Sequence, residues 1–599
     1  MAEAQVSNAF AISIDGTPLP ADVQPLLVTA TVEDNLNLPD LVVLVFRDQD
    51  RVVLQKTGAK VGSALVVTAA GTGQATPEKL LTAEVTAVEA EFDATGTFTV
   101  IRGYDPIHRL FRGRRTETYT QVTASDVAQK VAKRAGLKVG RIDATSTVFE
   151  HVTQGGVSDW EFLDKLAREI GREARVVDGS FEFREASPAS DAPAPGAPRT
   201  EPLALHQGTD LLRFRAVVTS SQQVKEVQVR GWDVAEKRAL IGTAPATSTG
   251  TQLQGASPAE LAKAFGDPVY VASDVPYRSQ AEVDAAARSL AEELGGAFAE
   301  FEGVARGNPS IHAGTAVAIA GMGAPFDGRY VVTTTRHRYD QAGGYTTHLT
   351  VSGRQDRSLL GLASGGAGGG RSLPGVVVAL VSDARDPEEQ GRVKLTFPWL
   401  SDDYVSDWAR TVHSGAGKDR GFQVLPEVGD EVLVAFEQGD VRRPYVIGGL
   451  WNGRDTPPKG PTDAVDGGSG AIARRSLVSR NGHRLDLLDK DGGPEGVSIT
   501  TKDDKLKLVL DATGTAVTLH SDGTVLVEAK QGVTIDAASS SMKLTAGDIQ
   551  LSAKTGVKID GGSGQVDVKT SGQLSLSGSM AKLAGSGQTE ITGGIVRIN

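Results

Sequence analysis

A short apolar repeat fills the last hundred residues of the chain. From about residue 506, pairs of apolar residues with one residue between them recur at intervals of seven to eleven residues, most often eight or nine. Glycine and small polar residues occupy the intervals. We assign the following pairs to the core of the structure that the repeat predicts: Val525 with Val527, Val533 with Ile535, Ile549 with Leu551, Val557 with Ile559, Val566 with Val568, and Leu574 with Leu576.

Each repeat offers only two inward side chains, so a single strand cannot bury a core, whereas a stack of strands can. Three chains wound together fit this short period best, because each chain then supplies one face of every layer. We therefore predict a trimeric intertwined β-helix at 501–599, a needle on the order of 50 Å long at the usual strand spacing. A monomeric β-sandwich is the alternative, although its strands are usually longer and less regular.

The amino-acid composition excludes some kinds of functional site and argues against nucleic acid as a partner. The 599 residues are too many for one core, so several domains are expected. Cysteine is absent, which excludes disulfides, thiolate metal sites and a cysteine nucleophile. The net charge of −12 argues against nucleic acid as a partner. The basic segment Arg109–Arg115 is interpreted as a solvated loop or a subunit contact.

The N-terminus has no basic segment followed by an apolar run, and no stretch approaches 18 consecutive apolar residues. We therefore expect synthesis and assembly in the cytoplasm without a signal peptide. If the protein leaves its cell, another machine must carry it.

The first 362 residues are expected to be mainly β, with a few helices. Leu41–Phe46 is a continuous apolar run, typical of a strand buried on both faces. We predict four segments: a first hub β-barrel-like domain at 1–115, a helical and hairpin insert with a linker at 116–200, a second hub β-barrel-like domain at 201–362, and a Gly-rich linker at 363–373.

Local signals place the helices. Thr123 or Ser125 can cap a helix that Gly136 ends, and Ser158 with Glu161 forms a capping box for a second helix. A third helix is expected from Ser279 to Leu294. Asp178-Gly179 marks a hairpin turn within 174–184, and the Ala/Pro/Ser-rich stretch 186–199 is interpreted as a linker or exposed loop.

Residues 374–453 form a compact β unit with polar loops, which suggests a five-stranded OB fold. A Pro/Gly-rich neck is expected at 454–500, between this unit and the needle. The expected strands are Val376–Val381, Arg392–Phe397, Trp408–His413, Glu431–Phe436 and Pro444–Ile447.

Several segments, taken in order, resemble the VgrG family of trimeric spikes found in type VI secretion systems, extracellular contractile injection systems and phage baseplates. The resemblance covers nearly the whole chain. In the N-terminal half it depends on Gly103-Tyr104-Asp105, Ser158–Leu163 and Gly328-Arg329-Tyr330. In the β unit it depends on Leu425–Val434 and Leu450–Gly453, with Pro426, Gly429, Asp430, Trp451, Asn452 and Gly453 as the OB motif.

The resemblance implies a homotrimer with a division of labour. The two barrel-like domains of each chain would form a pseudo-sixfold ring that adapts a sixfold, Hcp-like inner tube to a threefold needle, with baseplate proteins around it. The OB unit would be the collar. The needle would puncture the target membrane when the sheath contracts.

No catalytic activity, cofactor or metal is expected. Some hub-spike proteins carry a lysozyme domain after the OB unit, but the interval from Gly453 to about Thr500 is too short for one. The nine histidines lie far apart and form no HExxH motif. Gly415–Lys418 resembles the end of a phosphate loop but lacks the upstream glycine.

The needle tip is expected to bind another protein. No histidine follows His520, which excludes the iron site that His-x-His motifs build in some phage spikes. A blunt trimeric end would expose apolar core, so we hypothesise that a PAAR-repeat protein caps it and that effectors can be loaded there. The predicted interface is Ile595, Val596, Arg597, Ile598 and Asn599.

The main alternative is a glycan- or receptor-binding phage tail fibre or baseplate protein. Such a shaft would expose aromatic rings that stack on sugars, yet residues 500–599 contain no Phe, Tyr or Trp. The sequence leaves open whether the machine is a released injection particle, a cell-anchored secretion system or a phage.

Overall fold

The computed structural model describes residues 10–71, 76–198, 200–353 and 375–598. The chain divides into two compact units, Met1–Pro457 and Pro458–Asn599. The predicted Gly-rich linker at 363–373 and the last residue, Asn599, lie outside the described residues.

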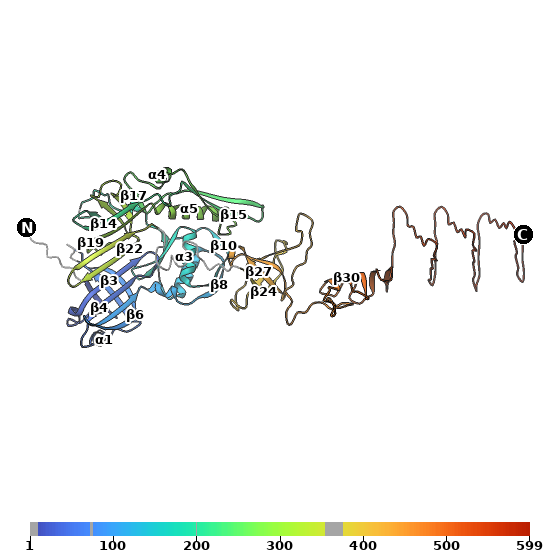
Figure 1. Ribbon diagram of the computed structural model, residues 1–599, viewed down its shortest axis with the longest axis horizontal. Helices are drawn as coiled ribbons and strands as arrows, with labels where there is room; N and C mark the ends of the chain where they lie inside the picture. Colours follow the sequence, from blue (N-terminus) through green and yellow to red (C-terminus); the bar gives the residue numbers. More distant parts are fainter. Residues whose placement is uncertain (1–9, 72–75, 199, 354–374, 599) are drawn as a thin grey trace, which may run out of the picture. The chain divides into compact units, whose positions relative to one another are not determined.

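One antiparallel sheet of eleven strands runs through the first unit (Figure 1). Both predicted barrel-like parts supply strands to it, and β22 joins them by pairing with β3, with Thr334 opposite Asn35 and Asp340 opposite Thr29. In sheet order the strands are β14 (Leu211–Val218), β19 (Ala299–Arg306), β23 (Gly344–Val351), β22 (Thr334–Asp340), β3 (Leu27–Asn35), β4 (Leu41–Arg47), β7 (Gly96–Tyr104), β6 (Glu78–Asp93), β5 (Ala64–Ala69), β1 (Phe10–Ile14) and β2 (Thr17–Pro18). The mainly β fold class is thereby confirmed.

Strand β4 shows how this sheet is packed. Val42, Leu44 and Phe46 are fully buried, together with neighbours such as Ile101. The alternate residues of β4 are only half-buried. The expectation that Leu41–Phe46 is buried on both faces was therefore wrong, because one face forms the core and the other keeps contact with solvent. The short helices α1 (Val53–Thr57) and η1 (Gln24–Leu26) lie in connections of this part.

The insert contains the two predicted helices, α2 (Ala124–Arg134) and α3 (Asp159–Glu169), and both begin at a capping box. The Thr123 hydroxyl accepts a hydrogen bond from the Asp126 N–H at 3.2 Å, so Thr123 rather than Ser125 is the cap. Ser158 does the same with Glu161 at 3.1 Å. Around them lie η2 (Pro106–Phe111), β8 (Arg115–Thr123), β9 (Lys138–Ile142), β10 (Val148–Val157), β11 (Arg172–Val177) and β12 (Ser180–Glu185).

The predicted hairpin at 174–184 is formed by β11 and β12, which pair across Asp178-Gly179. The stretch 186–199 is more ordered than a linker. It contains η3 (Ala189–Asp191), in which Ala189 is fully buried. Arg329 donates a hydrogen bond to the carbonyl of Pro193 at 3.2 Å, so this stretch packs against the strands that follow it. We call the strands between residues 10 and 104 the first β block and those between residues 204 and 351 the second β block.

Helix α5 (Gln280–Gly296) confirms the third predicted helix, with Ser279 as its cap. It packs on β15 and β16, where Val283 and Ala287 meet Val227 and Val229. A Cβ atom at Gly242 would collide with the carbonyl of Val283, so only glycine permits this approach. The remaining elements of this block are β13 (Ala204–His206), β15 (Glu226–Asp233), β16 (Arg238–Pro245), β17 (Thr251–Leu253), α4 (Pro258–Lys263), β18 (Val269–Ala272), β20 (Ala316–Ala320) and β21 (Gly328–Val331).

The OB unit has five strands in the order β25-β24-β27-β28-β26. All five predicted strands are present, and those expected at Arg392–Phe397 and Trp408–His413 are shorter than predicted. Phe397, Val432 and Val434 are fully buried in its core. The strands are β24 (Val376–Asp383), β25 (Lys394–Thr396), β26 (Arg410–Thr411), β27 (Glu431–Phe436) and β28 (Pro444–Gly449).

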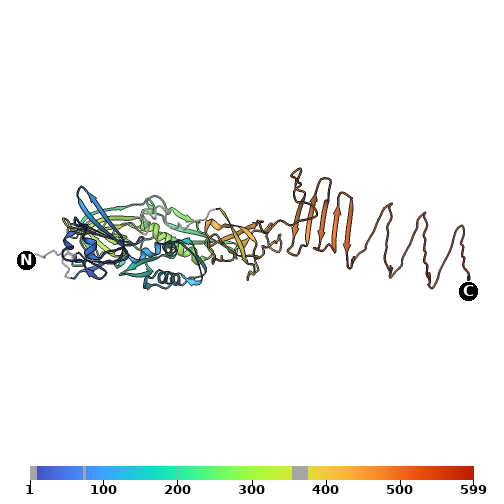
Figure 2. The ribbon, with the colours of Figure 1, turned by 90° about the horizontal axis from the view of Figure 1, so that it is seen from below.

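The second unit begins with an antiparallel sheet whose five strands follow one another in sequence order. Three of these strands lie in the interval that the sequence predicted to be neck. Figure 2 shows the strands side by side and the following chain running back and forth. Within the described stretch 522–598, one chain forms no strand by itself. The five strands are β29 (Arg474–Val478), β30 (Arg484–Asp489), β31 (Glu495–Thr500), β32 (Leu506–Asp511) and β33 (Ala516–Ser521).

Candidate functional site

The sheet β29–β33 has one strongly apolar face. The register aligns one apolar residue from each of the five strands into a single row, and a second row runs beside it. Because these side chains remain exposed in one chain, with Val517 at 72%, this face has no partner within the described part of the chain. The first row is Leu477, Leu485, Ile499, Leu508 and Leu519, and the second contains Leu487, Val497, Leu510 and Val517.

The opposite face of this sheet is polar and is covered by its own chain. Arg474 is 6% exposed and donates hydrogen bonds to the carbonyls of Thr462 at 2.9 Å and Pro458 at 2.8 Å. Asp486 is 1% exposed and accepts from Arg484 at 2.6 Å. Residues 458–472 therefore cover the polar face of the sheet, while the apolar face stays exposed.

The repeat beyond β33 makes few contacts within one chain. Among the described residues 523–598, two backbone hydrogen bonds form, Ser540 to Ala537 and Gly564 to Gly561. Successive segments of the repeat therefore do not pair with one another in a single copy.

The side chains that we predicted as needle core are exposed in the single chain. Their exposed fractions range from 52% to 78%, and in every pair the second residue is more exposed than the first. The prediction assigned them to a core between three chains, so their exposure in one chain leaves it a prediction. The exposed residues are Val525, Val527, Val533, Ile535, Ile549, Leu551, Val557, Ile559, Val566, Val568, Leu574 and Leu576.

The predicted tip interface is exposed in the same way. Ile595, Val596 and Ile598 have large exposed fractions, and Arg597 is exposed beside them. These side chains are accessible to another protein, and Asn599 lies outside the described residues.

The residues of the OB motif lie in two loops, one before β27 and one after β28. Gly429 adopts φ +97° and its N–H donates to the carbonyl of Val381 at 2.8 Å, while Asp430 accepts from the Glu427 N–H. Asn452 donates to the carboxylate of Glu431, the first residue of β27, at 2.7 Å. These contacts give the motif a structural role at the start of β27. Pro426 and Gly453 lie in the same loops, and Trp451 is 68% exposed.

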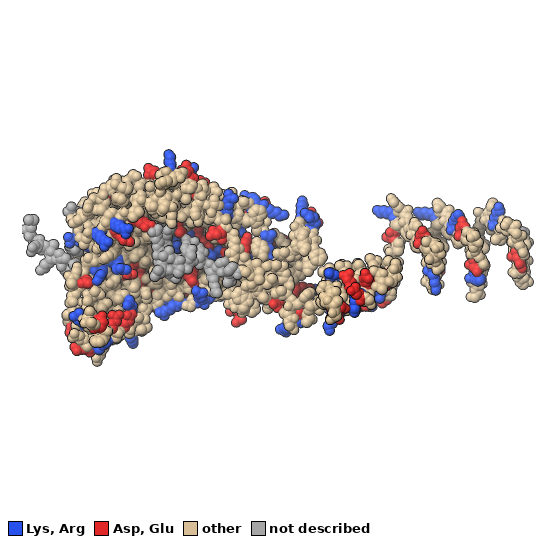
Figure 3. All heavy atoms as spheres, viewed as in Figure 1, with Lys and Arg blue, Asp and Glu red and all other residues tan. Residues whose placement is uncertain are grey.

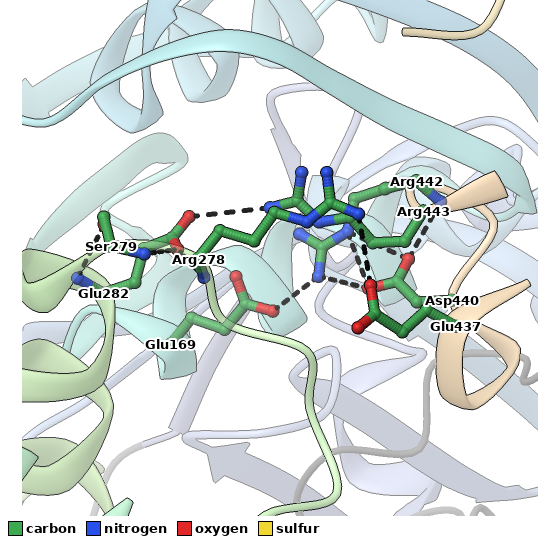
Figure 4. Close-up of polar contacts among 8 residues, drawn as sticks. All are labelled: Glu169, Arg278, Ser279, Glu282, Glu437, Asp440, Arg442 and Arg443. Carbon is green, nitrogen blue, oxygen red and sulfur yellow. Dashed lines mark hydrogen bonds and ion pairs between the residues drawn. The ribbon is translucent and has the colours of Figure 1, made fainter. Parts of the chain in front are cut away.

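A cluster of buried charges joins the OB unit to the helices of the N-terminal half (Figure 4). Arg442, just after η4 (Glu437–Gly439), donates to Asp440 at 2.8 Å and to Glu169 of α3 at 3.4 Å. Burial disfavours the charge on Asp440, but the adjacent Arg442 holds the pKa of that carboxyl well below its usual range. We call these three residues, together with Arg278, Glu437, Arg443 and Glu282, the charged junction.

Two further arginines connect the same loop to the start of α5. Arg278 lies 3.1 Å from the carboxylate of Glu437, and Arg443 lies 3.9 Å from that of Glu282. Glu282 also accepts from the backbone N–H groups of Arg278 and Ser279, which closes the cap of α5 (Figure 4). The charged junction thus links the OB loop to α3 and α5 through ion pairs between half-buried side chains.

Apolar packing supports the charged junction. Gly155 of β10 faces Val441, and a Cβ atom at Gly155 would lie 2.6 Å from the Val441 side chain. The absence of a side chain therefore lets the OB loop approach β10 closely. Sequence reasoning missed the partners of Arg278 and Arg442, because Glu437 and Glu169 lie 159 and 273 residues away from them.

The basic segment Arg109–Arg115 is largely neutralised. Arg109 donates to Glu84 at 3.1 Å, Arg115 lies 3.3 Å from Asp159, and Arg114 lies 3.8 Å from Glu161. On the face shown in Figure 3, basic and acidic side chains are interspersed. The segment thus fits a loop with internal partners.

No set of three or more histidine and acidic side chains in the described ranges is arranged to hold a metal ion. None of the helices in the described part of the chain has the length and apolar character that crossing a membrane requires.

The OB unit matches a known domain family. The model of the type VI secretion system/phage-baseplate injector OB domain matches residues 377–451. A second family model, the Alg8 N-terminal domain, matches residues 66–341. The injector OB domain confirms the predicted OB fold.

Curated relatives match over short segments. The type VI secretion system spike protein VgrG1a of Pseudomonas aeruginosa is 31% identical over 113 residues, which cover 18% of this chain and 18% of that protein. The actin cross-linking toxin VgrG1 of Vibrio cholerae is 37% identical over 75 residues, 12% of this chain and 7% of that protein. The match thus spans less than a fifth of the length of either relative.

Among solved structures, the lidded PdpA–VgrG complex of Francisella has a TM-score of 0.50 at 9% identity and covers 86% of this chain and 81% of that chain. At this identity the similarity concerns the fold alone. The OB match and the curated relatives make this chain similar to the spike proteins of injector and phage-baseplate systems. Within that class the chain is VgrG-like, which confirms the resemblance predicted from the sequence.

Proposed function

We propose that three copies of this chain form the central spike of a contractile injection machine. The observation that carries the proposal is the unpartnered apolar face of β29–β33, with two rows of exposed leucine, isoleucine and valine side chains. An apolar patch of this extent normally marks an interface. Because the polar face is covered by residues 458–472, the apolar face is the one left for other copies.

The repeat at 522–598 supports the same assembly. Its backbone groups find few partners within the chain, and its apolar pairs, from Val525 with Val527 to Leu574 with Leu576, are exposed. Three intertwined copies would supply strands above and below each segment and bury the pairs around a threefold axis, so that backbone and side chains are satisfied together. The resulting needle would puncture the target membrane on sheath contraction.

The N-terminal half would form the ring that meets the sixfold, Hcp-like inner tube, with baseplate proteins around it. Support comes from the eleven-stranded sheet, to which two parts of the chain contribute side by side, so a trimer would present six such parts. The charged junction would transmit force from this ring to the OB collar, because it binds the collar loop to two helices. Assembly in the cytoplasm, at the baseplate end of the particle, belongs to the same proposal.

At the far end of the needle, the exposed side chains of Ile595, Val596 and Ile598 would be covered by a PAAR-repeat tip protein, with Arg597 and Asn599 in the same interface. Effectors could be carried there. The chain itself would perform no catalysis, so that its role is mechanical.

A glycan-binding tail fibre is the alternative. The absence of aromatic residues from 500–599 argues against it.

The proposal is tested by inserting an epitope into the exposed OB loop near Gly415 and locating it by gold labelling on assembled particles. Label at the baseplate end of the sheath is expected, and cells lacking the chain should produce no particles that puncture membranes. Label on lateral fibres, or binding of the purified chain to a glycan array through its shaft, would favour the tail fibre instead.

A further inference from the structure

A second cluster of buried charges lies where three parts of the N-terminal half meet. Asp34 belongs to β3, Asp40 to the loop before β4, and Asp105 follows β7 directly. Arg175 comes from β11 of the insert, and His312 from the loop before β20. These residues line a cavity of about 220 Å³.

Asp34 is well satisfied as a carboxylate. It accepts hydrogen bonds from His312 Nδ1 at 3.0 Å and from the backbone N–H of Ala313 at 3.0 Å. Burial opposes its ionisation, but His312 and Arg175 hold the pKa of Asp34 below its usual range. Asp34 is therefore the negative charge that the cluster is built to hold.

Asp105 and Asp40 have less complete hydrogen bonding than Asp34. Asp105 is 2% exposed, and its Oδ1 atom has no hydrogen-bond partner among the described residues. Asp40 accepts one hydrogen bond, from the backbone N–H of Asn35 at 3.0 Å. Burial, and the nearby charge of Asp34, raise the pKa of both carboxyls well above the usual range. A buried carboxylate with few hydrogen-bond donors is costly, whereas the neutral carboxyl is much less so.

The other charged groups that face the cavity already have partners. Lys79 of β6 lies 3.1 Å from Asp178 of the β11–β12 turn, and Arg184 of β12 lies 3.4 Å from Glu182. Arg175 and His312 thus remain to balance three carboxylates. If Asp40 and Asp105 both ionise, negative charge exceeds positive charge at the centre of the cluster.

We propose that Asp40 and Asp105 are proton-binding groups of this three-way junction, and that loss of their protons loosens the contact between the first β block, the insert and the second β block. Because a raised pKa favours the protonated form in the folded state, this stabilisation is complete below the ordinary pKa of an aspartate. It is lost as the pH rises through the raised values. The junction is thus firmer in mildly acidic than in alkaline solution.

The test compares the thermal unfolding of the full chain and of Asp105→Asn between pH 4.5 and 8.5. The asparagine side chain has the shape of the neutral carboxyl. The stability of the variant relative to the wild type should therefore increase as the pH rises. The folded-to-unfolded ratio should change up to tenfold per pH unit and then level off above the raised pKa. Groups outside the cluster titrate equally in both proteins and cancel in the difference.

Asp178→Asn is the matched control, since Asp178 lies at the rim of the same cavity with its side chain 72% exposed. It should follow the wild type at every pH. Asp34→Asn should instead be less stable than the wild type at neutral pH, because it removes the charge that His312 and Ala313 bind.

Hydrogen exchange locates the effect. At pH 8, segments 100–111, 172–185 and 308–316 should exchange more slowly in Asp105→Asn than in the wild type, and at pH 5 the two should agree. A difference in unfolding temperature that does not vary with pH, or an Asp105→Asn protein that is less stable at pH 8, would overturn the proposal. Asp40→Asn provides the same comparison if Asp105→Asn fails to fold.

Discussion

The guanidinium of Arg442 lies 3.4 Å from the carboxylate of Glu169, although 273 residues separate the two in sequence. Arg442 belongs to the OB unit and Glu169 ends helix α3. Asp440 shares the same arginine at 2.8 Å, so one buried cation neutralises an acid of its own loop and an acid of the insert. Through this contact the OB loop is joined to α3.

Replacing Arg442 with methionine should destabilise the first unit by about 3 kcal/mol, because two largely buried carboxylates would lose their partner. Chemical denaturation of the full chain measures the change. Arg385→Met is the control, since Arg385 pairs with Asp383 at 3.0 Å but is 90% exposed. The control should lose far less stability, because water screens an exposed ion pair. Equal losses in the two variants would contradict a special role for Arg442.

Gly155→Ala should separate the OB loop from β10, because the new Cβ atom would lie 2.6 Å from Val441. Overpacking of this kind costs about 1–3 kcal/mol. The double variant that combines Gly155→Ala with Val441→Ala should regain much of that loss, because it removes the side chain that the new atom meets. The denaturation midpoints of the single and double variants measure this recovery of stability. A double variant no more stable than Gly155→Ala would argue against the contact between Gly155 and Val441.

Leu519→Asp should weaken the proposed trimer, since it places a charge on the apolar face of β29–β33 in every copy. Thr518→Asp is the matched control, because the neighbouring residue of β33 points to the opposite face. Native mass spectrometry should find trimers for the wild type and the control. The Leu519 variant should dissociate at lower temperature or appear as monomer, and a monomeric wild type would refute the trimer itself.

His337 should make the N-terminal half sensitive to acid. It is fully buried, accepts from the hydroxyl of Tyr345 and donates to the carbonyl of Ile311 at 2.9 Å. Burial, together with His312, lowers the pKa of His337 to about 3. The contribution of His337 to the free energy of unfolding is complete above the ordinary histidine pKa. It is lost as the pH falls from there toward about 3, by about 1.4 kcal/mol per pH unit.

Denaturation of the wild type and of His337→Gln between pH 7 and 4 tests this expectation, with a shallower pH slope expected for the variant. His483→Gln, at an exposed histidine, should keep the slope of the wild type. If His337→Gln keeps that slope too, the buried histidine is not the source of the acid sensitivity.

Much of the local structure could be predicted from the sequence. Three helix starts could be predicted because a capping box joins residues only three positions apart. They are the helices that begin after Thr123, Ser158 and Ser279. The five OB strands follow from alternating apolar residues in the same way. The predicted neck was too long, however, because β29 and β30 alternate apolar with charged residues, and Asp486 and Arg474 become buried only when residues 458–472 cover them.

The sequence by itself determined that the chain is mainly β, that it contains an OB unit, and that its last hundred residues cannot form a core alone. These properties depend on the spacing of apolar residues, which is local. Only the tertiary structure decided that β22 pairs with β3, that Arg442 meets Glu169, and that Asp34, Asp40 and Asp105 converge on Arg175. Such contacts depend on which distant surfaces pack together, and the residues on either side carry no local signal of their partner.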